Sequence, residues 1–219
     1  SDSIVLGVNC NTSSGPSITI GRNSSANGSV TTAIGNSAQV SADQSIGISG
    51  ENCTVSSGSS RSVVIGRQGR SDAQNAIAIG NFARVTSGGT NSICMSSSAL
   101  VQSDVSGSNA LVLTPGEYGG VTTQAHAIIL GSSTLGGSAV QSEAGIAIGR
   151  DAVVAASADG AVALGSGITA STSNTTTVAM LQIANYASAN YADDTAAATG
   201  GIPLGGVYHT AGDLKIRLT

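Results

Sequence analysis

Apolar and polar positions alternate with a period of two in short segments that recur along most of the chain. The recurring unit is a small residue, an aliphatic residue, a variable residue, a second aliphatic residue and usually a glycine, as in Ser17-Ile18-Thr19-Ile20-Gly21. A period of two is typical of a β-strand, in which successive side chains point to opposite faces. The pattern therefore predicts about a dozen short strands between residues 1 and 180.

The copies follow one another at a nearly constant spacing. In the first quarter of the chain a new copy begins every 14 residues, and later insertions lengthen the spacing to as much as 18. We expect the two aliphatic positions of each copy to face the interior and to form the structural core of the repeats. These positions are Ile4, Leu6, Ile18, Ile20, Ile34, Ile46, Ile48, Val63, Ile65, Ile77, Ile79, Leu111, Leu113, Ile128, Leu130, Ile146, Ile148, Val162 and Leu164.

A fainter second strand lies between consecutive copies. Two short strands joined by turns rich in Gly, Ser, Asn and Asp make one coil of a solenoid. Stacked coils pair as parallel strands at roughly 4.8 Å, so a dozen coils predict a rod on the order of 55 Å long. The second strands are expected at residues 38–40, 53–55, 83–85, 99–101, 152–154 and 168–170.

The fold class that follows is an all-β, parallel β-roll or β-solenoid of about twelve coils of 14–18 residues. Only five of the 219 side chains are aromatic and none is tryptophan, so the core must be narrow. So thin a rod buries little surface, and apolar residues at some middle positions, namely Val5, Val64, Val112 and Ile129, are expected to lie exposed. Packing of three copies around a common axis would cover one face of each rod, although periodicity alone does not specify three.

The repeat resembles the YadA-like head of trimeric autotransporter adhesins. The best matches are residues 76–85 (AIAIGNFARV), 145–154 (GIAIGRDAVV) and 32–40 (TAIGNSAQV), and the resemblance covers residues 1–180. It implies a left-handed parallel β-roll, a compact homotrimer and a head that binds host surfaces.

A second segment, residues 181–219, follows the repeats. Apolar residues at Leu181, Ala184, Ala187, Tyr191 and Ala198 predict a short helix that the following glycines and proline end. Two alternating runs around Ala211-Gly212-Asp213 predict a β-hairpin, with Leu214, Ile216 and Leu218 on one face. The ending, AAATGGIPLGGVYHTAGDLKIRL, resembles the C-terminal tail of small phage virion and tail-fibre proteins. We expect this segment to be a terminal cap or an attachment element.

Charge and candidate chemistry favour a non-enzymatic protein without a cofactor. The net charge of −4, with cationic residues scattered singly, disfavours nucleic acid, and no apolar run is long enough for membrane insertion. His126 and His209 lie far apart in the sequence, and the adjacent Asp193 and Asp194 are expected on a solvated helix face. No catalytic or metal site is predicted.

Two further sets of residues complete the prediction. Cys10, Cys53 and Cys94 fall where the repeat takes small residues and are expected to be buried or wall-lining thiols. The widened loop that holds Glu117 and Tyr118 offers weak candidates for receptor binding, with tolerated insertion as an equal alternative.

The function expected from the sequence is that of a trimeric fibre or decoration protein on a bacteriophage virion, presenting a surface for host attachment. The first alternative is the head of a trimeric autotransporter adhesin on a bacterial outer surface. The second is a polysaccharide-cleaving tailspike, which requires paired carboxylates on one face that the sequence does not display.

Overall fold

A computed structural model of the chain describes residues 2–97, 103–114, 121–122, 124–131, 139–179, 181 and 188–219. The chain forms two compact units, Ser1–Ala179 and Met180–Thr219. The predicted boundary, between residues 180 and 181, differs from this division by one residue.

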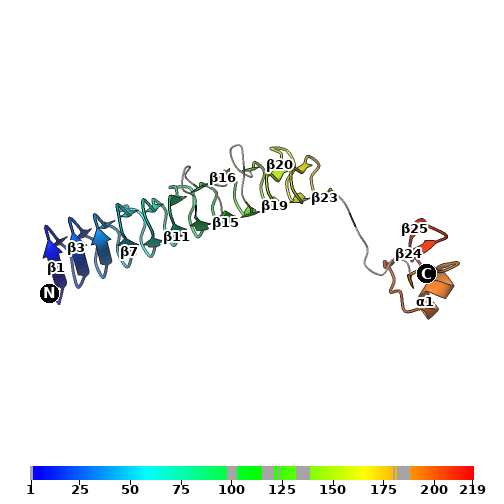
Figure 1. Cartoon of the computed structure of the whole chain (residues 1–219), viewed down its shortest axis with the longest axis horizontal. Coiled ribbons are helices and arrows are strands. Elements are labelled where there is room, and N and C mark those ends of the chain that lie inside the picture. Colours follow the sequence, from blue (N-terminus) through cyan, green and yellow to red (C-terminus); the bar gives the residue numbers. More distant parts are fainter. Residues whose placement is uncertain are drawn as a thin grey trace. The chain divides into compact units, whose positions relative to one another are not determined.

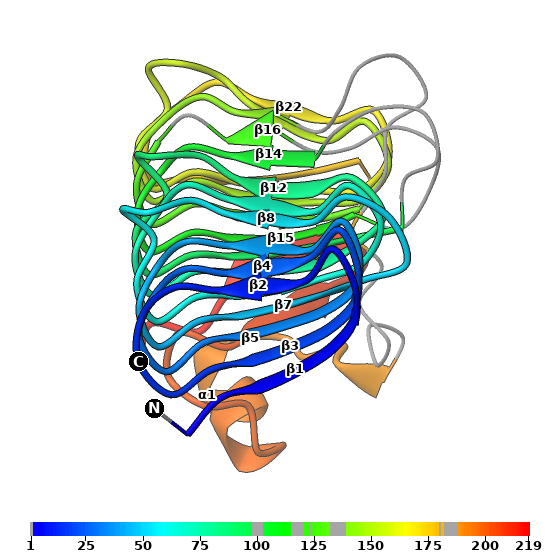
Figure 2. The same ribbon diagram turned by 90° about the vertical axis from the view of Figure 1, so that its left-hand side faces the viewer.

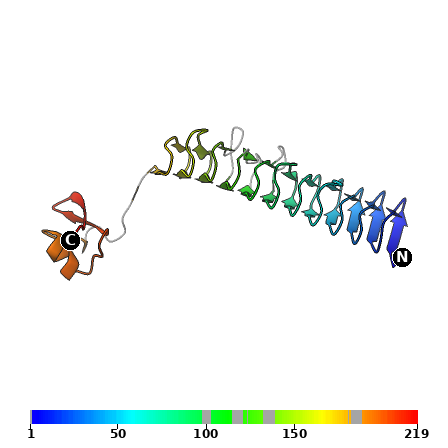
Figure 3. The same cartoon turned by 180° about the vertical axis from the view of Figure 1, so that it is seen from behind.

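The first unit is a β-solenoid, as predicted, with coils stacked side by side (Figure 1). Each coil contributes one strand to sheet A and one to sheet B, which face each other across the interior (Figure 2). In the described residues sheet A has 12 strands and sheet B has 11, all parallel within each sheet. The view from behind shows the same succession of coils (Figure 3).

Sheet A consists of β1 (Ile4–Val8), β3 (Ile18–Arg22), β5 (Thr32–Asn36), β7 (Ile46–Ser49), β9 (Val63–Ile65), β11 (Ile77–Gly80), β13 (Ile93–Ser96), β15 (Leu111–Thr114), β17 (Ile128–Leu130), β19 (Ile146–Ile148), β21 (Val162–Leu164) and β23 (Thr176–Val178). Sheet B consists of β2 (Asn11–Thr12), β4 (Ser25–Ala26), β6 (Gln39–Val40), β8 (Thr54–Val55), β10 (Arg70–Ser71), β12 (Ala83–Val85), β14 (Ser103–Val105), β16 (Val121–Thr122), β18 (Ala139–Val140), β20 (Val153–Val154) and β22 (Thr169–Ala170).

Equivalent positions of successive coils are direct neighbours in the sheets. Ile4 pairs with Ile18 and Ile18 with Thr32, and this register continues to the last strand of sheet A. The predicted second strands match sheet B except for the one at residues 99–101, which lies outside the described residues. The strand that pairs with β12 is instead β14, four residues further along the chain.

The interior of the solenoid is built from the middle residues of the sheet A strands and the inward residues of sheet B. Ala33, Val64, Ala78 and Val112 are fully buried, and valines such as Val85 meet them from sheet B. The prediction of which side faces inward is therefore wrong. The positions that point away from the interior, and of which none is buried, are Ile4, Leu6, Ile18, Ile20, Ile34, Ile46, Ile48, Val63, Ile65, Ile77, Ile79, Leu111, Leu113, Ile128, Leu130, Ile146, Ile148, Val162 and Leu164.

The physical reason is the narrowness of the coil. At Gly47, an inward position, an added Cβ would lie 2.6 Å from Cγ2 of Val40 on the opposite sheet. Small residues therefore fill the inside, while the larger Ile and Leu side chains stand outside. Ile129 is buried in the interior, whereas Val5 is 49% exposed because β1 has a neighbouring strand on one side only.

Buried hydroxyl groups connect successive coils where the position before a sheet A strand is Ser or Thr. The Ser62 hydroxyl donates to the Ala73 carbonyl (2.9 Å) and accepts from the Ala76 N–H (3.1 Å). Ser92 makes the equivalent bonds two coils later, to the Gly107 carbonyl and from the Ala110 N–H. These bonds give hydrogen-bond partners to buried backbone groups in the turns, outside the strand pairing. This role explains why a small polar residue often begins the repeat.

The glycine of the repeat is required by a close approach between coils. Gly21 has φ +136°, and a Cβ at this position would lie 1.8 Å from the Gly35 carbonyl oxygen. Only glycine combines this backbone conformation with the available space.

The second unit contains helix α1 (Asp194–Thr199) and an antiparallel hairpin of β24 (Val207–Thr210) and β25 (Asp213–Ile216). The hairpin confirms the prediction. The helix was predicted too early and too long: residues 182–187 lie outside the described residues, and 188–193 are not α-helical. Asp193 begins the helix as its N-cap, because its carboxylate accepts the Ala196 N–H at 2.8 Å.

Candidate functional site: the aliphatic face of sheet A

The outer face of sheet A carries two columns of side chains that run from coil to coil, which together we name the aliphatic face. The first column is interrupted by two threonines, and the second is aliphatic at every strand of the sheet. The first column holds Ile4, Ile18, Thr32, Ile46, Val63, Ile77, Ile93, Leu111, Ile128, Ile146, Val162 and Thr176. The second holds Leu6, Ile20, Ile34, Ile48, Ile65, Ile79, Met95, Leu113, Leu130, Ile148, Leu164 and Val178.

Much of this aliphatic face remains accessible in the single chain. Ile48 is 37% exposed, Met95 43% and Leu164 44%, although each is flanked by neighbours in its column. Around Met95 the face is hollowed into an open groove of about 390 Å³, which Ile79 and Leu113 also line. A continuous apolar surface of this extent is typical of a protein–protein interface.

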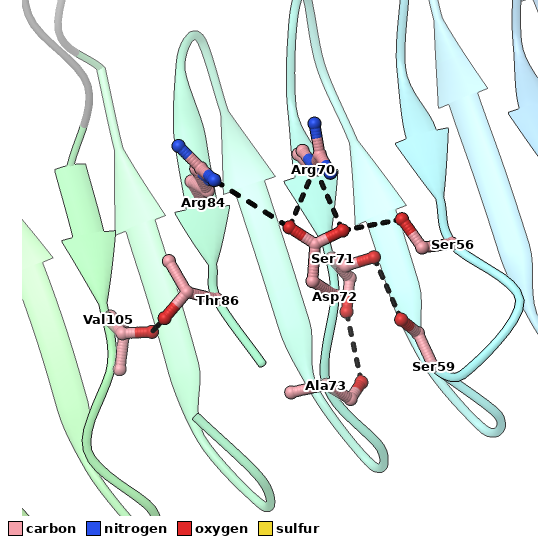
Figure 4. Close-up of polar contacts among 9 residues, drawn as sticks. All are labelled: Ser56, Ser59, Arg70, Ser71, Asp72, Ala73, Arg84, Thr86 and Val105. Carbon is pink, nitrogen blue, oxygen red and sulfur yellow. Dashed lines mark hydrogen bonds and ion pairs between the residues drawn. The ribbon is translucent and has the colours of Figure 1, made fainter. Parts of the chain in front are cut away.

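The outer face of sheet B differs, because its first seven strands present polar or charged residues. Its middle coils hold an ion-pair network around Asp72, whose carboxylate lies 2.7 Å from Nε of Arg70 and 3.8 Å from Arg84 (Figure 4). The Ser56 hydroxyl also donates to Asp72. Asp104 is beside Arg84 in the next strand, and burial raises its pKa while the guanidinium opposes that shift.

A second pair lies in the turns near this network. Nε of Arg67 is 2.8 Å from the Glu51 carboxylate, and its guanidinium carbon stands 5.6 Å from the centre of the Phe82 ring. We name Glu51, Arg67, Arg70, Asp72, Phe82 and Arg84 the charged cluster. Sequence reasoning missed it because these residues are scattered along the chain. The signal was available, since the 14 residues from Arg70 to Arg84 equal one coil.

The cysteine positions agree with the predicted environment. Cys53 and Cys94 are buried and Cys10 is partly buried, and none of the three is joined in a disulfide. Burial raises the pKa of Cys53 to about 11 and that of Cys94 to about 12, so these two thiols stay protonated near neutral pH.

The remaining predicted candidates have structural settings or lie outside the described residues. Glu117 and Tyr118 fall among the latter. His126 is exposed in the turn before β17, whereas His209 is nearly buried in β24 and accepts the Gly212 N–H at Nδ1. Asp194 is not simply solvated: it accepts hydrogen bonds from Tyr208 and from the last two residues.

The described part of the chain contains no cluster of three or more His, Cys, Asp or Glu side chains able to hold a metal ion. Within the same residues no helix has the length and apolar character needed to cross a membrane.

Comparison with known proteins gives no match to any family model, and no curated protein matches the chain. The fold and its aliphatic face define a class of protein. The chain is a β-solenoid repeat protein in which the outer face of sheet A is mostly apolar and that of the first seven strands of sheet B is polar.

Proposed function

We propose that the chain is a trimeric fibre or decoration protein of a bacteriophage virion. Three copies pack their aliphatic faces around a common axis and leave their sheet B faces outside for attachment to the host. The observation that carries this proposal is the second column of the aliphatic face, which is apolar at all 12 strands of sheet A.

Burial of apolar surface supplies the driving force for this association. Full burial of an Ile or Leu side chain contributes roughly 1.5–3 kcal/mol. Covering one that is about 40% exposed therefore contributes roughly 1 kcal/mol. Twenty-two apolar side chains line the two columns, of which seven are 37–64% exposed and the others less, so burying them together offsets the cost of association.

The number of copies and the finer architecture rest on the resemblance to YadA-like heads. That resemblance supports a left-handed roll of about twelve coils and threefold symmetry around an axis along the rod. In such an arrangement equivalent coils of the three chains lie at the same height, which suits columns of constant apolar character.

The phage assignment rests on the C-terminal tail, residues 196–218, which is similar to the endings of small virion and tail-fibre proteins. The charged cluster on sheet B is the best-defined polar surface among the described residues for contact with a host. Its guanidinium groups suit carboxylated or phosphorylated sugars of a bacterial envelope.

The solution mass of the purified chain, measured by light scattering, tests the trimer. A mass of three times 21.2 kDa at micromolar concentration is the expected result. A stable monomer of 21.2 kDa would contradict the proposal, since the aliphatic face would then have no partner copy.

Attachment is tested separately, by binding of labelled trimer to immobilised acidic and neutral bacterial polysaccharides. We expect the Arg70→Ala/Arg84→Ala variant to lose at least tenfold in affinity for the acidic polysaccharides, because it removes two cations of the charged cluster. Arg22→Ala, which removes an exposed arginine of β3 outside this cluster, is the matched control. Equal binding by both variants would exclude the cluster as the attachment surface.

A further inference from the structure

The hairpin of the second unit carries an aliphatic surface of its own. Leu214 and Ile216 lie on one face of β25, and Val207, the cross-strand partner of Ile216, shares that face. Leu218 continues the alternation beyond the strand. The exposed fractions are 39% for Val207, 60% for Leu214, 55% for Ile216 and 77% for Leu218. We name these four residues the hairpin stripe.

The opposite face of the hairpin already has a partner. Tyr208 points to that side, is 3% exposed, and donates its hydroxyl hydrogen to Asp194 of α1 at 2.6 Å. Its ring also meets Tyr191 in an edge arrangement, with 6.5 Å between the ring centres. The Tyr208 face is therefore covered, whereas on the face of the stripe only His209, the cross-strand partner of Leu214, is buried.

The second unit buries too little to account for an ordered fold. Of the described residues 188–219, only Ala197, Tyr208 and His209 are buried. Units of about 40 residues generally need disulfides, metals or oligomerisation to be stable, because their buried fraction is small.

The end of the stripe is nevertheless held in place. The Asp194 carboxylate accepts the backbone N–H groups of Leu218 at 2.6 Å and Thr219 at 3.0 Å. Together with the Tyr208 bond, these contacts lower the pKa of Asp194. Because both N–H groups bond to the same carboxylate, this clasp presents Leu218 in a defined position.

We infer that the hairpin stripe is a second self-association surface, covered by the stripes of the other two copies of the chain. This inference rests on the proposed trimer. Once three solenoids associate, their C-terminal units are confined near one another at an effective concentration on the order of millimolar. The three stripes then meet without further loss of translational freedom, and burying them completes the core that each unit lacks.

Cysteine cross-linking in the full chain tests the inference. Cys10 is first replaced by serine, since Ser24 holds the equivalent place one coil later and donates to Gly35 as Cys10 does to Gly21. Ile216→Cys then places a thiol in the stripe, and Lys215→Cys places one on the opposite face of the same strand. Both proteins are oxidised gently, and the covalent dimer is followed on denaturing gels.

The expected result is that Ile216→Cys forms the interchain disulfide at least tenfold faster than Lys215→Cys. Light scattering of the same samples separates the possible failures. If the protein is a trimer and both variants react equally fast, the proposed contact between hairpin stripes is wrong, while the proposed trimer of solenoids stands. A monomer overturns the proposed function and this inference with it.

A second variant guards against local effects of the thiols. In the otherwise native full chain, Leu214→Ser/Ile216→Ser should keep the trimeric mass but increase protease cleavage within residues 188–219 by tenfold or more. Lys215→Ser is the matched control. If the double variant resists cleavage as well as the control does, the stripe is not covered by other copies.

Discussion

Sheet A and sheet B are built from the same coils but present opposite chemistry to the outside. Inside the solenoid they contribute alike, with small residues such as Ala78 from sheet A and Val85 from sheet B. Outside, sheet A shows one uninterrupted apolar column and one interrupted by two threonines, whereas the first seven strands of sheet B show polar residues and an ion-pair network. The inward residues of both sheets pack against each other within one chain. Folding of the coil therefore does not require the outer faces to differ, and we attribute their difference to what each face contacts.

The largest expected effect comes from placing a charge on sheet A. Ile34→Asp puts three carboxylates into the proposed trimer contact, where they would be desolvated without partners. We expect the variant to be monomeric in light scattering. Gln39→Asp makes the equivalent change on sheet B of the same coil and should remain trimeric. A trimer in both cases would place the interface elsewhere.

The next effect concerns the glycine at the end of the sheet A strands. Gly21→Ala combines an unfavourable φ of +136° with a contact of 1.8 Å to a carbonyl oxygen, so we expect a loss of about 3 kcal/mol or more in the free energy of unfolding. Gly58→Ala, in the turn after β8 of sheet B, meets no atom within 4 Å. Chemical denaturation of both variants checks the difference, and similar losses would show that the close approach is not the cause.

A smaller effect separates the inside of a strand from its outside. Val154 and Val153 are adjacent in β20, but only Val154 is fully buried. Val154→Ala should lower the free energy of unfolding by about 2 kcal/mol through the cavity it leaves, and Val153→Ala by less than about 1 kcal/mol. The reverse order would contradict the assignment of Val154 to the interior and of Val153 to the outer face.

The smallest effect is expected at the ion pairs of sheet B. Arg70 is about half exposed, and an exposed pair typically contributes less than about 1 kcal/mol to stability. Arg70→Ala should therefore hardly change the melting temperature, measured by circular dichroism. A large decrease would mean that the network holds the coils together instead of serving as a surface.

The repeat period made most of the solenoid predictable. Regular recurrence of Ser-Ile-x-Ile-Gly is enough to place the sheet A strands and their register, because parallel pairing stacks equivalent positions. The same period cannot say which alternate set faces inward. That choice depends on the width of the coil, and the small residues at positions such as Ala33 and Gly47 carried the signal.

Irregular positions escaped prediction for local reasons. The sheet B strand after the longest early insertions is Ser103–Val105, because insertion length shifts the strand that pairs with β12. Helix α1 begins only after Asp193 since the helix start depends on a capping hydrogen bond, not on apolar spacing. The charged cluster required coil-to-coil distances, which become readable only when the register is known.

The constant register of the coils also means that the length of the solenoid depends on the number of coils. Removing the 14 residues from Ile18 to Thr31 would bring Thr32 to the place of Ile18, with every later column still aligned. Each coil gained or lost changes the length of the rod by roughly 4.8 Å, the spacing between paired strands. Duplication or deletion of whole coils can thus change the length of the solenoid without redesign of its interior.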